Sequence, residues 1–300
     1  MKSFFKGFFM TLLIILLLVG GGYYYLTSKG HDADAKETLE TVTGEGENHQ
    51  ILVLGVDSAD AGKAENTRSD VMMIANVNRD KNQVSLISIP RDTRTSIPGR
   101  NGKTKINHAY AYGGADLALD TVNGLLGLDI PYYVVVDYDF VKEVVDKTGG
   151  VQVDVPMDMH YEDPSADPPL YIDLKAGPQV LDGDQALQFL RFRKGYANAD
   201  LGRVEAQQAF LKGLFQAATS KNALINSPRL IKPYLTKTQN NLSVGKALGI
   251  GLDGLKVGSE NFITGTLPGS PQTIEGLSYY ILDEGASQDM LVDYGFKPGQ

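Results

Sequence analysis

The apolar run Ile51-Leu52-Val53-Leu54-Gly55-Val56 decides the fold class, because such a run reads as a strand buried on both faces. Two further apolar runs follow at residues 71–77 and 84–89, and the polar residues 78–82 between them have the composition of a hairpin turn. Helical patterns alternate with later strands. The sequence therefore predicts an α/β (α+β) fold, in which a mixed central β-sheet is flanked by helices on both faces.

The rest of the chain continues this mixture. Residues 156–169 are rich in Pro and Asp, and we expect a loop there. The other expected strands are 132–136, 151–155, 262–267 and 278–282, and the expected helices are 115–126, 140–147, 183–191, 201–218, 244–255 and 287–294.

The N-terminus predicts a membrane anchor. Residues 7–26 carry no charge, and a spanning helix needs ~20 such residues. Lys2 and Lys6 precede the run and favour a cytoplasmic N-terminus. The alternative, a cleaved signal peptide, fits less well because the run is long and ends in Tyr23-Tyr24-Tyr25. The expected organisation is a cytoplasmic tail (1–6), a transmembrane signal-anchor (7–26), a linker (27–49) and an extracytoplasmic catalytic domain (50–295).

Composition excludes several classes of function. The formal net charge of −8 argues against a nucleic-acid partner, which needs a basic face. The chain has no cysteine, so disulfides, thiolate catalysis and cysteine-ligated zinc are excluded.

A set of arginines points to a phosphorylated substrate. Arg191 and Arg193 are two residues apart and would point the same way in extended chain, whereas Arg203 and Gln207 are four apart and would share a helix face. The guanidinium group is a planar fork of donors that suits phosphate oxygens. For each arginine alone, a surface ion pair with one of the 36 acidic residues is the competing interpretation.

Carboxylates follow the first strand and open the second. Asp57 comes directly after the first strand, and Asp70 follows Arg68 at the start of the next. If these strands are neighbours, the two acids lie close enough to hold Mg²⁺ against phosphate oxygens. A turn-capping Asp57 and a surface Arg68–Asp70 pair are the structural alternatives.

Arg91 follows the third strand, at Ser88-Ile89-Pro90-Arg91-Asp92. Because Pro90 cannot donate a backbone hydrogen bond, it ends the hydrogen-bonded pairing of the third strand. Arg91 is therefore expected at the same sheet edge as Asp57 and Asp70. Lys103 and Lys105 add cations, and His108 is more simply interpreted as a hydrogen-bonded surface or cap residue than as a catalyst.

Several short motifs occur together in a fixed order, and the ordered set resembles the LytR–CpsA–Psr family of cell-wall glycopolymer ligases over about residues 50–295. The motifs are Gly55-x-Asp57, Arg68-Ser69-Asp70, Ser88-x-Pro90-Arg91-Asp92, Lys105-Ile106-Asn107-His108-Ala109, Gly149-Gly150-Val151, Leu181 to Leu187, Arg191-x-Arg193, and Asp200-x-Gly202-Arg203 with Gln207-Gln208.

The resemblance implies an enzyme that transfers phosphorus-containing groups. Such enzymes move a glycopolymer (wall teichoic acid or capsular polysaccharide) from undecaprenyl diphosphate to peptidoglycan, forming a phosphodiester and releasing polyprenyl phosphate. They act outside the membrane in a Gram-positive type of wall, and the prenyl chain lies in an apolar tunnel. The diphosphate-binding residues implied are Arg68, Arg91, Lys105, Arg191, Arg193, Arg203 and Gln207.

The same resemblance implies that Asp57, Asp70 and Arg91 are catalytic and that Asp57 and Asp70 bind Mg²⁺, with Mn²⁺ as the alternative ion. Two family arginines are replaced here, by Ala59 and Ala206. Competing functions are a non-catalytic scaffold or regulator that binds polyprenyl phosphate, and a lipid diphosphate hydrolase. A transcriptional role conflicts with an acidic domain outside the membrane.

Overall fold

The computed structural model describes residues 48–56, 69–165, 169–192, 195–196, 200–218, 238–255, 257 and 261–297. The proposed anchor at residues 7–26 and residues 27–47 of the linker lie outside these ranges. The last two linker residues, 48 and 49, are described, and His49 already belongs to the first strand. Among the described helices, none is both long and apolar enough to cross a membrane.

A six-stranded mixed sheet forms the centre of the domain, with the strand order β11-β6-β1-β2-β3-β12. Strand β1 runs antiparallel to β2 and parallel to β6, and β3 runs parallel to β12. The expected mixed sheet is therefore confirmed, and its first two strands are neighbours. The strand bounds are β1 (His49–Val56), β2 (Ser69–Asn78), β3 (Gln83–Ser88), β6 (Tyr132–Val136), β11 (Thr238–Asn240) and β12 (Phe262–Thr266).

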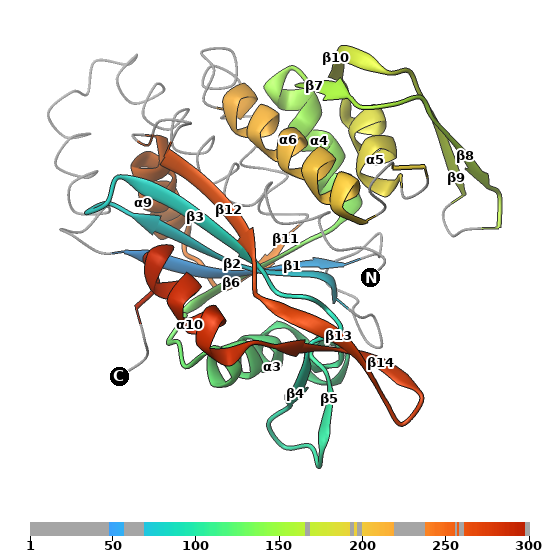
Figure 1. Ribbon diagram of the computed structural model, residues 1–300. Helices are drawn as coiled ribbons and strands as arrows, with labels where there is room; N and C mark the ends of the chain where they lie inside the picture. Colours follow the sequence, from blue (N-terminus) through green and yellow to red (C-terminus); the bar gives the residue numbers. More distant parts are fainter. Residues whose placement is uncertain are drawn as a thin grey trace, which may run out of the picture.

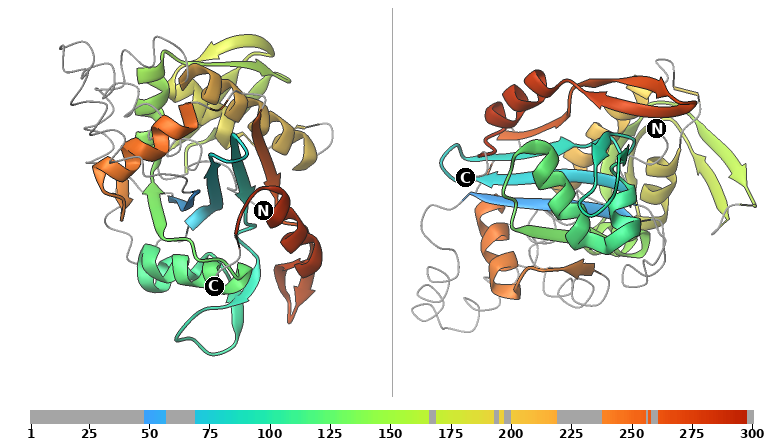
Figure 2. Two further views of the ribbon diagram at one scale, coloured as in Figure 1. Left: turned by 90° about the vertical axis from the view of Figure 1, so that its left-hand side faces the viewer. Right: turned by 90° about the horizontal axis from the view of Figure 1, so that it is seen from below.

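Helices cover both faces of this sheet, as Figures 1 and 2 show. On one side lie α4, α5 and α6, and on the other lie α3 and α10 (Figure 1). The helix bounds are α3 (His108–Leu126), α4 (Tyr138–Thr148), α5 (Gly183–Arg191), α6 (Asp200–Ala218), α9 (Val244–Leu255) and α10 (Glu284–Asp293).

The sequence of β1 explains the two layers. Ile51 and Val53 belong to the core under α4, α5 and α6, whereas Leu52 and Leu54 belong to the core over α3 and α10. Since alternate side chains of a strand point to opposite faces, a strand covered on both sides must be apolar throughout. All eight residues of β1 are buried.

Short strand pairs, largely missed from sequence, extend from the central layers. They are β4 (Arg94–Ser96) with β5 (Lys103–Lys105), β7 (Val151–Val155) with β10 (Gly177–Leu181), β8 (Met159–Asp163) with β9 (Leu170–Leu174), and β13 (Gly269–Ile274) with β14 (Leu277–Leu282).

The expected loop at residues 156–169 is wrong in part. Strand β8 occupies Met159–Asp163 and pairs with β9 as a two-stranded ribbon. Met159 is fully buried, and the four residues after it alternate between exposed and partly buried. The strand signal is therefore a short period-2 pattern within a polar stretch. Pro and Asp flank this ribbon and hide it in the composition.

Helix α3 begins before the expected residue 115. It starts at His108 and is interrupted at Gly113 and Gly114, which have non-helical dihedral angles. Gly114 has φ of 68°, a left-handed conformation that favours glycine. The sequence pattern therefore identified only the part of the helix after this kink.

Candidate active site at one edge of the sheet

One edge of the central sheet collects the ends of several strands that carry the predicted site residues. Val56 at the end of β1 pairs with Ser69 at the start of β2, and Ser88 at the end of β3 pairs with Met73 of β2. Gly55 also pairs with Val136, the last residue of β6. Neighbouring strands lie about 4.8 Å apart, so the ends of β6 and β3 are roughly 15 Å apart.

A β-bulge sits at this edge. Gly55 pairs with Val71 and Val56 pairs with Ser69, so Asp70 is the extra residue of β2 and has no partner on β1. Bulges redirect side chains and often occur next to active sites. Asp57 and Arg68 lie outside the described residues, as does the side chain of Asp70, but the bulge places the Asp70 backbone beside the residue that precedes Asp57.

The segment after β3 is tied to the β4–β5 hairpin. The amide of Asn107 donates to the carbonyl of Arg91, 3.2 Å away, and the amide of Ile106 donates to the carbonyl of Thr93 at 2.8 Å. Lys105 Nζ lies 2.8 Å from Asp92 Oδ1, and Arg91 Nε lies 3.9 Å from Asp92 Oδ2. Arg91 and Lys105 are thus brought to one carboxylate.

These three charged side chains are partly withdrawn from water. Their exposed fractions are 20% for Arg91, 17% for Asp92 and 26% for Lys105. Partial burial weakens solvent screening, so the cations act more strongly on an approaching anion than surface cations would. Asp92 offsets part of this charge and restrains both cations, a positioning role that the motif alone did not assign.

Polar atoms are also buried around this segment, and sequence reasoning missed them. The described residues include ten side-chain atoms that are buried without a hydrogen-bond partner, and five oxygen atoms among them are Ser69 Oγ, Ser88 Oγ, Thr93 Oγ1, Asn107 Oδ1 and Tyr110 Oη. Buried polar atoms normally have partners, so such a group marks a place where a ligand or water is accommodated. For Ser69 and Ser88, the available signal in the sequence was a small polar residue at a strand end.

Burial also perturbs Tyr110, which lies one helical turn beyond Asn107. Its side chain is fully buried, and burial, with a smaller effect of Tyr133, raises the pKa of Tyr110 to about 12. The phenol therefore remains neutral at physiological pH and is unsuited to act as a base.

Arg191, at the end of α5, lies near the same edge of the central sheet. It is the last residue of this helix, and its guanidinium carbon lies 5.4 Å from the centre of the Tyr138 ring. Tyr138 opens α4 directly after Asp137, which follows the end of β6. The cation–π contact therefore links Arg191 to the end of a central strand.

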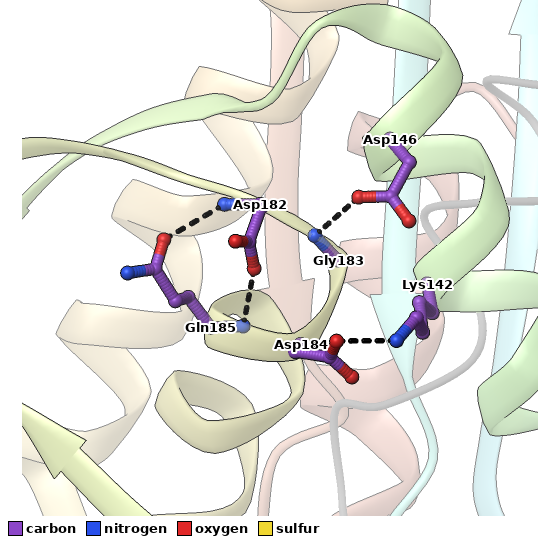
Figure 3. A network of polar contacts seen from close by, with 6 residues as sticks. All are labelled: Lys142, Asp146, Asp182, Gly183, Asp184 and Gln185. Carbon is purple, nitrogen blue, oxygen red and sulfur yellow. Dashed lines mark hydrogen bonds and ion pairs between the residues drawn. The ribbon is translucent and has the colours of Figure 1, made fainter.

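The position of α5 is fixed at its first turn (Figure 3). Asp182 and Gln185 form a reciprocal capping box, and the amide of Gly183 donates to Asp146 Oδ1 of α4 at 2.8 Å. A Cβ on Gly183 would lie 2.5 Å from the Lys142 carbonyl oxygen, so this close approach requires glycine. Lys142 also pairs with Asp184.

The remaining predicted residues are placed only in part. Arg191 is the last residue of α5, and Phe192 after it is extended. Arg193 lies outside the described residues, so the expected common direction of Arg191 and Arg193 stays a prediction. Arg203 and Gln207 belong to α6, which starts at Asp200, one residue before the expected start, but their side chains lie outside the described residues.

Two further sequence interpretations can be compared with the structure. Ala206 is buried in the core of α4, α5 and α6, which explains why a small apolar residue suits this position. His108 Nδ1 lies 2.8 Å from Thr104 Oγ1, in agreement with its interpretation as a hydrogen-bonded residue at a helix start.

The arrangement is suited to binding the oxygen atoms of an anion such as a phosphate. It combines cations on two sides of the sheet edge with buried hydroxyl and amide groups. Within the described ranges, no group of three His, Asp or Glu side chains is arranged to hold a metal ion. That finding leaves the Asp57–Asp70 pair untested.

Comparisons with known proteins agree on one family. The model of the LytR_cpsA_psr family matches residues 22–293. The polyisoprenyl-teichoic acid–peptidoglycan teichoic acid transferase TagU of Enterococcus faecalis is 34% identical over 238 residues, which cover 79% of this chain and 76% of that protein.

Solved structures share the fold. The crystal structure of Bacillus subtilis TagV aligns with a TM-score of 0.68 and 27% identity, covering 85% of this chain and 100% of TagV. A structure of TagT bound to LI-WTA aligns with a TM-score of 0.64 and 26% identity, covering 84% of this chain and 90% of TagT.

Proposed function

The chain belongs to the LytR–CpsA–Psr family, and from this premise we propose that it transfers a glycopolymer from a polyprenyl diphosphate carrier to peptidoglycan. The transferase relatives support the reaction, and the structure of TagT bound to LI-WTA supports the class of donor. The observation in this chain that carries the proposal is the convergence of Arg91, Lys105 and the Asp70 bulge at one sheet edge.

In the proposed reaction, an acceptor hydroxyl oxygen attacks the phosphorus atom that carries the glycan. A new phosphorus–oxygen bond forms, the bond to the bridging oxygen breaks, and polyprenyl phosphate leaves with that electron pair. The hydroxyl proton passes to a nearby base. Phosphoryl transfer depends mainly on positioning and on stabilisation of charge, so it needs little covalent chemistry from the protein.

The arginines and Lys105 would perform most of this work. Arg91 and Lys105 would bind the non-bridging oxygens of the diphosphate from one side, and Arg191 with Arg193 would approach from α5. Arg68, Arg203 and Gln207 complete the proposed binding set. Asp92 would keep Arg91 and Lys105 in place. An arginine that binds two phosphate oxygens at once would restrict the orientation of the phosphate.

We further propose Mg²⁺ at Asp57 and Asp70, with Mn²⁺ as the alternative ion. The bulge supports this pairing because it lies at the end of β1, beside Val56, and Asp57 follows Val56 in the sequence. Carboxylates facing phosphate oxygens suit a hard cation, which would supply charge neutralisation. One of the two acids would also be placed to accept the hydroxyl proton.

The membrane anchor belongs to the same proposal. A carrier lipid stays in the bilayer, so a helix at residues 7–26 followed by the linker at 27–49 would hold the catalytic domain at the outer surface. The polymer is proposed as an anionic one, teichoic acid before capsular polysaccharide, because the named relatives are teichoic acid transferases.

The decisive test is a transfer assay. Full-length protein in detergent is incubated with undecaprenyl-diphosphate-linked glycan, peptidoglycan and Mg²⁺, and the product is digested and analysed by mass spectrometry. We expect a phosphodiester between glycan and peptidoglycan and an equal amount of polyprenyl phosphate. Release of lipid phosphate without attached glycan would identify a hydrolase, and tight lipid binding without any product would identify a scaffold.

A further inference from the structure

A pocket lies on the opposite side of the sheet from α4, α5 and α6. Its walls come from the β4–β5 hairpin, from the second half of α3, from the end of β14 and from α10, elements that Figure 1 shows together below the sheet. Its volume is about 790 Å³. Ligand pockets commonly measure roughly 300–1,000 Å³, so this one can hold far more than an ion.

The charges of this pocket are mixed. Arg94, Arg100 and Lys103 line it together with Asp120 and Glu284. Within the described part of the chain, none of the three cations forms an ion pair, although the protein carries a net charge of −8. Unpaired cations in an acidic protein are available to bind an anion.

Two of the cations are held in place by aromatic rings. The guanidinium carbon of Arg94 lies 5.7 Å from the centre of the Tyr279 ring, and that of Arg100 lies 4.6 Å from the centre of the Tyr112 ring. Such contacts orient the guanidinium groups before a ligand arrives. Arg94 Nε is buried, and no described group accepts a hydrogen bond from it.

Arg94 links the pocket to the candidate active site. Arg94 pairs with Lys105 across the β4–β5 hairpin, and Lys105 Nζ lies 6.0 Å from the centre of the same Tyr279 ring. Lys105 in turn pairs with Asp92, next to Arg91. A row of cations therefore runs from Arg91 through Lys105 and Arg94 into the pocket.

We propose that this pocket binds an acidic group on a sugar chain, as an extension of the active site for one of its two substrates. Arg94, Arg100 and Lys103 would bind the phosphate or carboxylate. Asp120, Glu284 and the amide of Gln288 would accept hydrogen bonds from sugar hydroxyls. The assignment rests on the proposed transferase function, which supplies two such chains: the anionic glycopolymer and the carboxylate-bearing peptidoglycan.

The test measures binding without turnover. Full-length protein in detergent is titrated calorimetrically with three probes: an oligo(glycerol phosphate), a soluble disaccharide–peptide fragment of peptidoglycan and a neutral chito-oligosaccharide. The variant Arg100→Gln/Lys103→Gln alters two exposed side chains and should leave the fold intact, as thermal unfolding would show. Lys81→Gln, an exposed lysine in the turn between β2 and β3, is the matched control.

We expect an acidic probe to bind the native protein, and its Kd to rise about tenfold or more in the double variant, with no change in the control. A phosphate-specific loss would assign the pocket to the donor polymer, and a carboxylate-specific loss would assign it to the acceptor. Equal binding by native protein and double variant, or no binding of either acidic probe, would overturn the proposal.

The transfer assay separates this proposal from the function on which it rests. If the native protein transfers glycan and the double variant binds the probes as tightly as native, the pocket assignment fails and the function stands. If the variant loses binding but the native protein makes no phosphodiester, the pocket stands as a glycan site and the transferase function fails.

Discussion

The variant Asp92→Asn tests whether Asp92 restrains the cations of the candidate site. Asn keeps the size of the side chain and removes its charge. Lys105 Nζ lies 2.8 Å from the carboxylate, with exposed fractions of 26% for Lys105 and 17% for Asp92. The pair is therefore intermediate between an exposed pair, which contributes about 0–1 kcal/mol, and a fully buried pair, whose disruption costs about 3–5 kcal/mol.

A hydrogen bond to a charged group contributes about 1.5–3 kcal/mol, and we expect Asp92→Asn to lower the free energy of unfolding by this amount. Urea denaturation of full-length protein measures it. A double-mutant cycle with Lys105→Met isolates the pair, and the expected coupling energy is about 1–2 kcal/mol. The rate of transfer should fall about tenfold or more, because Lys105 and Arg91 lose their common anchor.

Removing a carboxylate also makes the site more positive, which would favour an anionic donor. This effect predicts tighter donor binding together with slower transfer, so KM and kcat should both fall. Unchanged stability, zero coupling and full transfer activity in Asp92→Asn would refute the positioning role.

Three further outcomes are expected. Tyr110→Phe removes a buried hydroxyl that has no described partner, so stability at pH 7 should change little. Because burial raises the pKa of Tyr110 from 10.0 to about 12, the native protein should lose stability as pH rises from 10 to 12, and this loss should shrink in the variant. Asp253→Ala should cost about 3–5 kcal/mol in urea denaturation, because the fully buried carboxylate lies 3.4 Å from both His49 Nε2 and Arg79 Nε. Chelation by EDTA should stop transfer, and Mg²⁺ or Mn²⁺ should restore it while Ca²⁺, with its different coordination preference, should not.

The central layers of the fold follow from the sequence because their signals are long. The run at residues 51–56 and the helical period at 183–191 each extend over several turns or alternations, and both elements were predicted within about two residues. One pair of neighbouring strands also follows from simple rules, since a hairpin turn makes β2 and β3 antiparallel neighbours.

The short ribbons could not be predicted in this way. Strands such as β4 (Arg94–Ser96) and β5 (Lys103–Lys105) are three residues long and polar, so they exist through pairing with each other and through the contact of Thr93 with Tyr280 of β14. Such tertiary contacts leave no period in the sequence. The pocket lined by Arg94 and Arg100 depends on these strands and was missed with them.

The candidate site was partly accessible from the sequence. Residues that follow strand ends, such as Arg91, could be assigned to one edge because strand direction is readable. The role of Asp92 and the buried Asn107 Oδ1 depends on how the segment after β3 folds against the β4–β5 hairpin, which no local pattern encodes.

The central claim is that Arg91, at the edge shared by β1, β2 and β3, binds the donor diphosphate during glycan transfer. The most direct measurement is the initial rate of phosphodiester formation by full-length Arg91→Ala, with Lys81→Gln as the control and unfolding curves recorded for both. We predict a loss of at least about a hundredfold for Arg91→Ala with its fold retained, because a bidentate charged contact is removed where charge develops. A native transfer rate in folded Arg91→Ala would contradict the account.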